Sequence, residues 1–273
     1  MKLPEKAITA AADLAAGAAI AAKRNRGGYT AAVIVAAGNS TRMGGKVSKQ
    51  FSKVAGVPVL CRTLSAFRDS GVIDEIVIVA REEDRAAVCE LAGKSGLSGV
   101  LPFSVVTGGK TRALSVQNGF AAVSPKAKYV AIHDGARCLI TPEDIRKVCR
   151  AAVRYRAATA AHPVTDSVKL ANSRGFIEKS VDRKKVWLVQ TPQVFLADLY
   201  RAALATAGDT ATVTDDNALM EQIRYPVKLV ECNRDNIKIT TPDDICRAEE
   251  ILRRSEEHTS ELQSLPNLVC RLR

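Results

Sequence analysis

Residues 31–45 read AAVIVAAGNSTRMGG, a run of six apolar residues followed directly by a loop with three glycines. A continuous apolar run is typical of a parallel strand that is buried on both faces, and such strands occur in α/β proteins. The glycines allow backbone N–H groups of the loop to approach a phosphate group closely. This stretch therefore predicts an α/β fold whose first loop belongs to the functional site.

The alternation of apolar runs and helical patterns continues as far as Ala158. Further strands are predicted at 75–80, 103–106 and 129–133, and helices at 58–68, 82–92, 111–122 and from Thr141-Pro142 onward. Strands that alternate with helices form a parallel sheet with helices on both faces. We therefore predict a doubly wound, mostly parallel sheet with its site at the carboxyl ends of the strands.

Residues 167–181 interrupt this alternation. They read as two strands about the turn Asn172-Ser-Arg-Gly175, which predicts a β-hairpin inserted into the α/β frame. A hairpin is only marginally stable alone, so it must pack against something else, and an arm that interlocks with a second subunit is one solution. Beyond the hairpin, the patterns predict helices near Ala197 and Asp215, a strand at 227–230 and a last helix from Thr241-Pro242.

Composition excludes several classes of protein. The chain of 273 residues is 47% apolar and 25% charged, as expected for one large or two small globular domains. No apolar run approaches the ~18 residues of a membrane span. The seven cysteines are scattered, with no cluster at zinc-binding spacing. We therefore expect reduced thiols in a cytoplasmic protein that binds no membrane.

The net charge of +11 indicates an acidic partner. Aromatic residues make up only 4% of the chain and basic residues alternate with acidic ones, so the sequence contains no stacking platform with a basic stripe for nucleic acid. A polyanionic small substrate such as a nucleoside triphosphate accounts for the same charge. We therefore expect that kind of substrate and no nucleic-acid partner.

Both ends of the chain differ from its core. Residues 1–29 form an Ala-rich extension, with ten alanines between Ala7 and Ala22, and we interpret it as a surface helix or an upstream start codon rather than as a signal peptide. Residues 254–273 begin with a stretch that matches the translation of a sequencing-library adapter, so we expect a non-native tail that breaks the preceding helical pattern. The extension holds five basic and two acidic residues and the charges of the tail cancel, which leaves +8 on the core domain at 30–253.

Two cations, Arg42 and Lys49, stand seven residues apart in and just after the first loop. The loop contains neither the Gly-x-Gly-x-x-Gly of dinucleotide-binding proteins nor the Gly-Lys-Ser/Thr of a P-loop. Cations at this spacing can straddle a triphosphate and stabilise the negative charge that develops during transfer at phosphorus. The alternative is an ordinary turn between a strand and a helix, with two solvated basic side chains.

Eight motifs in a fixed order carry a resemblance to a known family. Ala36-Ala-Gly-x-x-x-Arg-Met-Gly44 with Lys49-Gln-Phe51 resembles the signature of nucleotidyltransferases that activate sugars and sugar alcohols. The others are Gly108-Gly-Lys-Thr-Arg-Ala-Leu-Ser-Val116, His133-Asp-Gly-Ala-Arg137, Pro163-Val-Thr-Asp-Ser-Val-Lys169, Val181-Asp-Arg183, Gln190-Thr-Pro-Gln193, Thr214-Asp-Asp216 and Asp235-Asn-Ile-Lys-Ile239. Together they resemble the 2-C-methyl-D-erythritol 4-phosphate cytidylyltransferase family of the non-mevalonate isoprenoid pathway, over residues 30–252.

The resemblance implies transfer of CMP from CTP to 2-C-methyl-D-erythritol 4-phosphate, below abbreviated to methylerythritol phosphate, with release of pyrophosphate and with Mg²⁺ as cofactor. It also implies a Rossmann-like nucleotidyltransferase fold for 30–253 and a homodimer joined through an arm at 164–186. The attacking phosphate monoester has a second pKa near ~6, so it is ionised at pH 7 and needs no general base. The reaction depends on cations that hold two polyanions in line.

The resemblance assigns roles to individual residues. Arg42 and Lys49 stabilise the transition state, and Arg183 and Lys238 position the substrate phosphate, with the arm residues acting in their own chain or in the neighbouring one. Asp134 and Asp235 are candidate Mg²⁺ ligands, although an Asx turn explains Asp235 equally well. The remaining binding residues, at the nucleotide or the substrate, are Ala36, Ala37, Gly38, Gly108, Gly109, Arg112, Ser115, Asp134, Arg137 and Ser167.

Several single residues are open to a purely structural interpretation. His133 ends an apolar strand and is interpreted as a hydrogen-bonded core residue. Asp215 and Asp216 are interpreted mainly as helix-capping residues. Ser48 and Cys138 stand where the family usually has proline, so we expect less rigid loops at both positions.

Two other functions are compatible with parts of the sequence. Ribitol 5-phosphate cytidylyltransferases resemble this chain through the first loop and the Thr-Pro-Gln segment, but Val181-Asp-Arg183 and Asp235-Asn-Ile-Lys238 favour methylerythritol phosphate. A non-catalytic nucleotide- or RNA-binding protein is the second alternative. The presence of both Arg42 and Lys49 argues against it.

Overall fold

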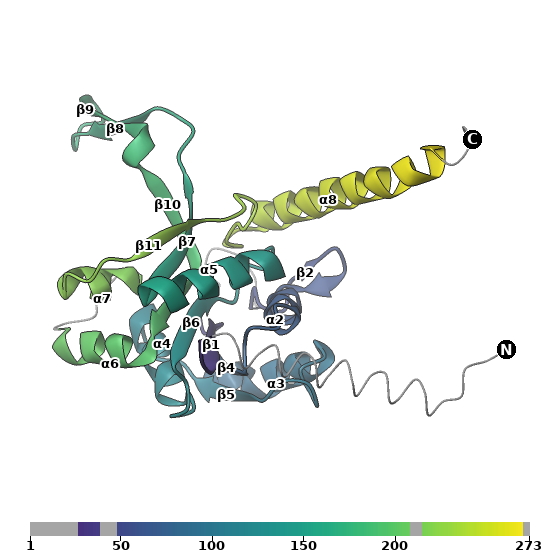
Figure 1. Ribbon diagram of the computed structural model, residues 1–273, viewed down its shortest axis with the longest axis horizontal. Coiled ribbons are helices and arrows are strands. Elements are labelled where there is room, and N and C mark those ends of the chain that lie inside the picture. The colour runs from purple at the N-terminus through teal and green to yellow at the C-terminus, as the bar shows by residue number, and fades with distance from the viewer. Residues whose placement is uncertain (1–26, 39–47, 208–214, 270–273) are drawn as a thin grey trace.

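A seven-stranded sheet forms the centre of the molecule in the computed structural model, which describes residues 27–38, 48–207 and 215–269, with side chains up to Ser255 (Figure 1). Its strands are β1 Thr30–Val35, β4 Glu75–Ala80, β5 Phe103–Thr107, β6 Tyr129–Asp134, β7 Ala157–Pro163, β10 Trp187–Leu196 and β11 Lys228–Glu231. They follow the order β11-β7-β10-β6-β1-β4-β5 across the sheet. β10 runs antiparallel to β6 and β7, and the other neighbouring strands are parallel.

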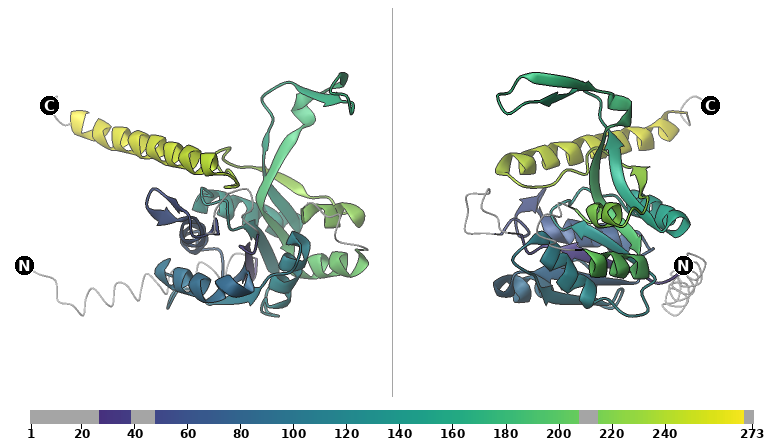
Figure 2. Two further views of the ribbon diagram at one scale, coloured as in Figure 1. Left: turned by 180° about the vertical axis from the view of Figure 1, so that it is seen from behind. Right: turned by 90° about the vertical axis from the view of Figure 1, so that its left-hand side faces the viewer.

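Helices cover both faces of this sheet (Figure 2). One face packs against α2 Val59–Asp69, α3 Arg85–Lys94 and α5 Pro142–Tyr155, and the other against α4 Arg112–Ala121, α6 Ala197–Thr206 and α7 Asn217–Gln222. Side chains alternate between the faces along a strand. In β1, Ala32 and Ile34 therefore join the first cluster and Val33 joins the second. This double burial explains the unbroken apolar run, and the predicted doubly wound α/β fold is confirmed.

Most of the predicted elements are present, with boundaries that differ by a few residues. The helix predicted at 82–92 is divided into a 3₁₀ turn, η2 Glu82–Asp84, and α3. A short antiparallel pair, β2 Lys53–Val54 and β3 Val57–Pro58, was not predicted. It turns through Ala55 and Gly56, both with positive φ, and the Ala55 N–H donates to the Glu249 carboxylate at 2.8 Å.

Strands β7 and β10 were also missed by the sequence analysis. β7 consists largely of alanine, which has a low strand propensity. β10 contains Pro192, and a proline within an apolar run is evidence against a central strand. The structure accommodates Pro192 because the pairing of β10 with β7 shifts register between Val189 and Gln193, where the strand is irregular.

The predicted hairpin forms an arm that projects from the body of the molecule (Figure 1). Its strands, β8 Val168–Ala171 and β9 Ile177–Val181, are antiparallel and lie beyond the ends of β7 and β10. Asn172 closes the turn, because its Oδ1 accepts hydrogen bonds from the N–H groups of Arg174 and Phe176, both at 3.0 Å. The 3₁₀ turn η3 Arg183–Lys185 joins the arm to β10. The hairpin is confirmed, and its contact with a second subunit stays a prediction.

The last helix, α8 Pro242–Val269, is longer than expected. We predicted that the helical pattern breaks at Arg254, and this is wrong, because α8 continues through that residue and extends away from the body (Figures 1 and 2). Residues 254–265 contain neither glycine nor proline and include glutamate and leucine, which have a high helix propensity. In the described part of α8, apolar packing on the core involves Ala248, Ile251 and the partly buried Leu252.

We expect a chain that ends at Arg253 to keep its melting temperature within about 2 °C, because the described apolar packing of α8 ends at Leu252. A chain that ends at Arg247 also loses Ala248 and Ile251. It should melt about 10 °C lower, since burial of one isoleucine side chain stabilises a fold by ~2–3 kcal/mol. Thermal unfolding followed by circular dichroism measures both shifts. A large loss of Tm in the chain ending at Arg253 would show that the tail is part of the fold.

Candidate active site

A cleft of about 590 Å³ opens at the carboxyl ends of the parallel strands. The chain passes from β1 to β4 on one side and returns to β6 on the other, so the topological switch point of the sheet lies between β1 and β6. Loops that follow β1, β4, β5 and β6 meet there. The predicted site residues that line the cleft are Ala37, Gly38, Lys49, Gly108, Gly109, Arg112, Ser115, Asp134 and Lys238.

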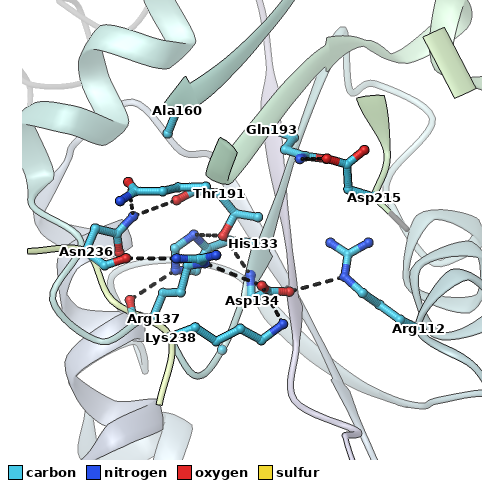
Figure 3. A network of polar contacts seen from close by, with 12 residues as sticks. Arg112, His133, Asp134, Arg137, Ala160, Thr191, Gln193, Asp215, Asn236 and Lys238 are labelled. Atoms are coloured by element: carbon cyan, nitrogen blue, oxygen red, sulfur yellow. Dashed lines mark hydrogen bonds and ion pairs between the residues drawn. The ribbon is translucent and has the colours of Figure 1, made fainter. Parts of the chain in front are cut away.

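Asp134, the last residue of β6, lies at the centre of this site and is only 7% exposed (Figure 3). Its Oδ2 is 2.9 Å from Lys238 Nζ and 3.5 Å from Arg137 Nε, and its Oδ1 is 3.2 Å from Arg112 Nε. Burial alone would raise the pKa of Asp134. The charges of Lys238, Arg112 and Arg137 outweigh that effect and hold its pKa well below the usual range, so Asp134 is ionised.

Arg112, in the first turn of α4, is shared between two buried carboxylates. Its Nη1 is 2.8 Å from Asp216 Oδ2, and Asp216 Oδ1 accepts a hydrogen bond from the Tyr200 hydroxyl at 2.6 Å. Our interpretation of Asp216 as a capping residue is therefore wrong, since its side chain makes no cap bond and instead holds Arg112. The interpretation of Asp215 is confirmed, because its Oδ1 accepts from the Ala218 N–H at 3.2 Å.

A buried polar network supports Asp134 from behind (Figure 3). The Thr191 hydroxyl accepts from the Asp134 N–H at 3.1 Å and lies 2.9 Å from His133 Nδ1, and His133 Nε2 is 3.2 Å from the Arg137 carbonyl oxygen. These contacts fit a neutral imidazole that donates through Nε2 and accepts at Nδ1. Complete burial lowers the pKa of His133 to about 3. His133 is therefore a hydrogen-bonded core residue, as predicted.

The glycines at 108 and 109 allow the loop after β5 to pack closely on its neighbours. Their N–H groups donate to the Ala80 carbonyl at 2.8 Å and to Ser115 Oγ at 3.0 Å. A Cβ atom at Gly108 would lie 2.4 Å from the Cβ of Ala37, which is closer than any side-chain contact allows. Gly108 thus brings the loop after β5 against the loop after β1, whereas Gly109 lets the same loop pack on Leu114 of α4, next to the buried Ser115.

Lys49 enters the cleft from a segment that two buried side chains fix in place. The Gln50 amide donates to the Ala36 carbonyl, and the Ser48 hydroxyl bonds to Gln50 Oε1. Ala36 itself is buried and does not line the cleft. Its N–H donates to the Val79 carbonyl at 2.7 Å, so its contribution is to anchor Gln50 beside Lys49. Gln50 was missed as a site residue, although its position next to Lys49 in the Lys-Gln-Phe motif was the available signal. Arg42 lies outside the described residues.

Four further predicted residues do not line the cleft of this chain. Ser167 and Arg183 are exposed on the arm, where Arg183 Nη1 donates to the Thr165 carbonyl at 2.7 Å. Asp235 lines a separate cavity of about 440 Å³, and its N–H donates to Asn233 Oδ1 at 2.9 Å in the manner of an Asx turn. Arg137 is half-buried behind the cleft, between Asp134 and the loop that contains Asp235.

The carboxylates of the site suit one mode of Mg²⁺ binding. The part of the chain that the structure describes contains no group of three or more His, Cys, Asp or Glu side chains that could enclose a metal ion. Mg²⁺ in phosphate-handling enzymes is held by one or two carboxylates, with substrate phosphates and water completing its octahedral shell. Asp134, ionised at the floor of the cleft, fits that mode.

The fold and the cleft define a nucleotide-binding α/β enzyme that handles phosphate groups. The described residues that line the cleft include several cations, which suits transfer at phosphorus by positioning and charge stabilisation. Residues 30–254 match the family described as 2-C-methyl-D-erythritol 4-phosphate cytidylyltransferase. The chain belongs to this family, and it is therefore a nucleotidyltransferase.

Individual relatives and solved structures agree with this assignment. The chain is 42% identical over 224 residues to the 2-C-methyl-D-erythritol 4-phosphate cytidylyltransferase of Caldanaerobacter subterraneus subsp. tengcongensis, a match that covers 82% of this chain and 98% of that protein. It also resembles the crystal structure of 4-diphosphocytidyl-2C-methyl-D-erythritol synthase from Anaerococcus prevotii, with a TM-score of 0.72, 31% identity and coverage of 83% and 99%. The cytidylyltransferase structure from Thermus thermophilus gives a TM-score of 0.67 at 31% identity, with coverage of 82% and 99%.

The buried, neutral His133 makes stability depend on pH. Its pKa is lower in the folded chain than in the unfolded chain, so below pH 6.5 the unfolded chain binds a proton that the folded chain does not. The contribution of His133 to the free energy of unfolding is therefore largest above pH 6.5, and it falls as the pH decreases toward the pKa of His133 in the folded chain. Between pH 7 and pH 5 we expect His133 to contribute a loss of about 2 kcal/mol, which His133→Gln abolishes. Urea unfolding of both chains at the two pH values measures the difference, and equal pH dependence would contradict the assigned protonation state.

Proposed function

We propose that this cleft transfers the cytidylyl group of CTP to methylerythritol phosphate and releases pyrophosphate, the reaction that its family performs in isoprenoid biosynthesis. The observation that carries the proposal is the gathering of Lys49, Arg112 and Lys238 around a cleft whose floor holds the ionised Asp134. Family membership names the substrates, and it favours methylerythritol phosphate over ribitol phosphate and catalysis over a non-catalytic binding role.

The charges of the cleft match the needs of this reaction. The nucleophile is an oxygen of a phosphate monoester, which is ionised near pH 7, so no residue has to remove a proton. Both substrates are polyanions that repel each other. Asp134 and Asp216 neutralise only part of the charge of Lys238, Arg112 and Arg137, and the remaining positive charge attracts both substrates. We assign Lys49, with Arg42 in the preceding loop, to the transition state, and Lys238 to the methylerythritol phosphate.

The segment 108–115, which ends in the first turns of α4, is assigned to cytidine. It borders the cleft and presents the buried Ser115 hydroxyl and the backbone of two closely packed glycines. Arg112, fixed by Asp216, separates this part of the cleft from Asp134. Such a rigid loop suits the recognition of one base, because its polar groups are held before the nucleotide enters.

Mg²⁺ is the proposed cofactor, and Asp134 is the residue that would hold it together with oxygens of the triphosphate. The bound ion would neutralise negative charge on the phosphates during transfer. Asp235 is less well placed for this role, because it lines the separate cavity. On binding the ion, the Asp134 carboxylate would give up some of its ion pairs with Lys238, Arg112 and Arg137.

A homodimer joined through the arm is proposed from what the arm exposes. Leu170, Phe176 and Ile177 are 52%, 66% and 69% exposed, an apolar surface that a partner would cover. Ser167 and Arg183 lie on the same arm, away from the cleft of their own chain. In a symmetric dimer these two residues would reach the cleft of the neighbouring subunit and complete its substrate site.

A cytoplasmic location is proposed from the thiols. The described cysteines are free, and Cys89 and Cys246 are exposed, which favours a reducing compartment. As a separate finding, no described helix combines the length and the apolar character needed to cross a membrane.

A pyrophosphate-release assay tests the function, with CTP, UTP, ATP and GTP each combined with methylerythritol phosphate or ribitol 5-phosphate. We expect turnover with CTP and methylerythritol phosphate, and in that assay Lys49→Ala should lower kcat by roughly 10²–10³-fold, as for the loss of one charge-stabilising donor. Lys53→Ala is the matched control, since Lys53 is exposed on β2 outside the cleft. Activity with ribitol phosphate alone would refute the substrate, and a Lys49→Ala enzyme above one third of wild-type kcat would remove Lys49 from the catalytic residues.

Complementation tests whether the arm acts in the neighbouring subunit. Lys49→Ala and Arg183→Ala chains should each be inactive as homodimers. Co-expressed, they form about half mixed dimers with one intact site each, so activity should return to about a quarter of wild type. Mixed dimers without activity would place Arg183 in the site of its own chain, and a monomer in sedimentation at assay concentration would refute the dimer.

A further inference from the structure

The segment 233–239 brings Lys238 to the site without regular secondary structure of its own. A segment of this kind depends on side-chain contacts to hold one conformation. Asn236, two residues before Lys238, is completely buried although it carries a polar amide. On the other side of Lys238, the Ile239 N–H donates to the Ala136 carbonyl at 2.9 Å, and Ile239 is buried as well. Lys238 is thus attached to the core at two points, before and after it in the chain.

Asn236 connects this segment to two other parts of the site (Figure 3). Its Nδ2 donates to Gln190 Oε1 at 3.1 Å and to the Thr191 carbonyl at 2.9 Å, both in the irregular part of β10. Its backbone carbonyl oxygen accepts from Arg137 Nη1 at 2.9 Å. Thr191 also supports Asp134 through its hydroxyl, so one buried amide joins the residues around the central carboxylate.

We propose that Asn236 is a positioning residue, which acts through Lys238 by holding it on Asp134. The inference deepens the proposed function, on which the role of Lys238 rests. The amide is needed for its two donated hydrogen bonds rather than for its volume, because its Oδ1 is buried with no hydrogen-bond partner among the described residues. An apolar side chain would fill the same space without an unpaired acceptor, but it could not fasten the segment to the oxygen atoms of β10.

A double-mutant cycle between Asn236→Ala and Lys238→Ala tests the proposal. In the wild-type background, Asn236→Ala should lower kcat/KM for methylerythritol phosphate by about 10²-fold, the effect of a misplaced substrate-binding group. In the Lys238→Ala background, the same change should cost less than about threefold, because the group it positions is already absent. Equal losses in the two backgrounds would overturn the proposal, and so would a Lys238→Ala enzyme with wild-type activity.

The matched control is Arg234→Ala. Arg234 belongs to the same segment but is exposed, and its side chain makes no hydrogen bond or ion pair among the described residues. This variant should retain wild-type kcat/KM. A purely structural role of Asn236 would appear as a lower Tm with a similar loss of activity in both backgrounds. If Asn236→Ala does not fold, Asn236→Ser, which keeps one hydroxyl donor, replaces it in the cycle.

The same double-mutant cycle can be measured without catalysis, from the affinity of each variant for methylerythritol phosphate in calorimetry. Asn236→Ala and Lys238→Ala should each weaken binding, and the double variant should bind no more weakly than Lys238→Ala alone. This result would support the role of Asn236 even if the wild-type chain released no pyrophosphate, in which case only the proposed reaction would fail. Additive losses in binding would refute the inference while leaving the reaction untouched.

Discussion

The ionised carboxylate of Asp134 is the interaction on which the rest of the site depends. Lys238, Arg112 and Arg137 would repel one another at the distances found here if no negative charge stood between them. Burying one carboxylate is unfavourable, and its three cationic partners offset that cost. The cations are therefore held together before any substrate arrives, and a substrate does not have to order them.

The sheet topology decides where this carboxylate can stand. Asp134 ends the strand next to β1, at the switch point, where loops leave toward opposite faces of the sheet and a cleft opens between them. β10, which pairs antiparallel with β6, brings Thr191 behind Asp134, and the irregular pairing of β10 brings Gln190 toward Asn236. The antiparallel strand of the sheet thus supplies the supporting side of the site.

Elements of the fold could be predicted from the sequence where residues close together in the chain determine them. Double burial leaves an apolar run, so β1, β4 and β6 were predictable, and the arm was predictable from the Asn172–Gly175 turn. β7 and β10 were not, because alanine and proline mask strands that the surrounding sheet imposes. Asp216 was misread for a related reason. Its partner Arg112 is 104 residues away, and no local pattern reports a contact at that separation.

Two strands of the central sheet, β7 and β10, lead directly into the arm, and this limits how such a protein can diverge. β7 and β10 continue from the core toward the hairpin, with Leu188 paired to His162 and Val189 to Ala161. We call the paired residues 161–163 of β7 and 187–189 of β10 the stalk of the arm. A one-residue insertion in the β10 part of the stalk would turn every following side chain to the opposite face and displace Gln190 and Thr191 from the site. The turn at 172–175 lies at an exposed tip and has no such constraint. Changes in length should therefore accumulate at the tip of the arm during evolution, while the stalk keeps a constant number of residues.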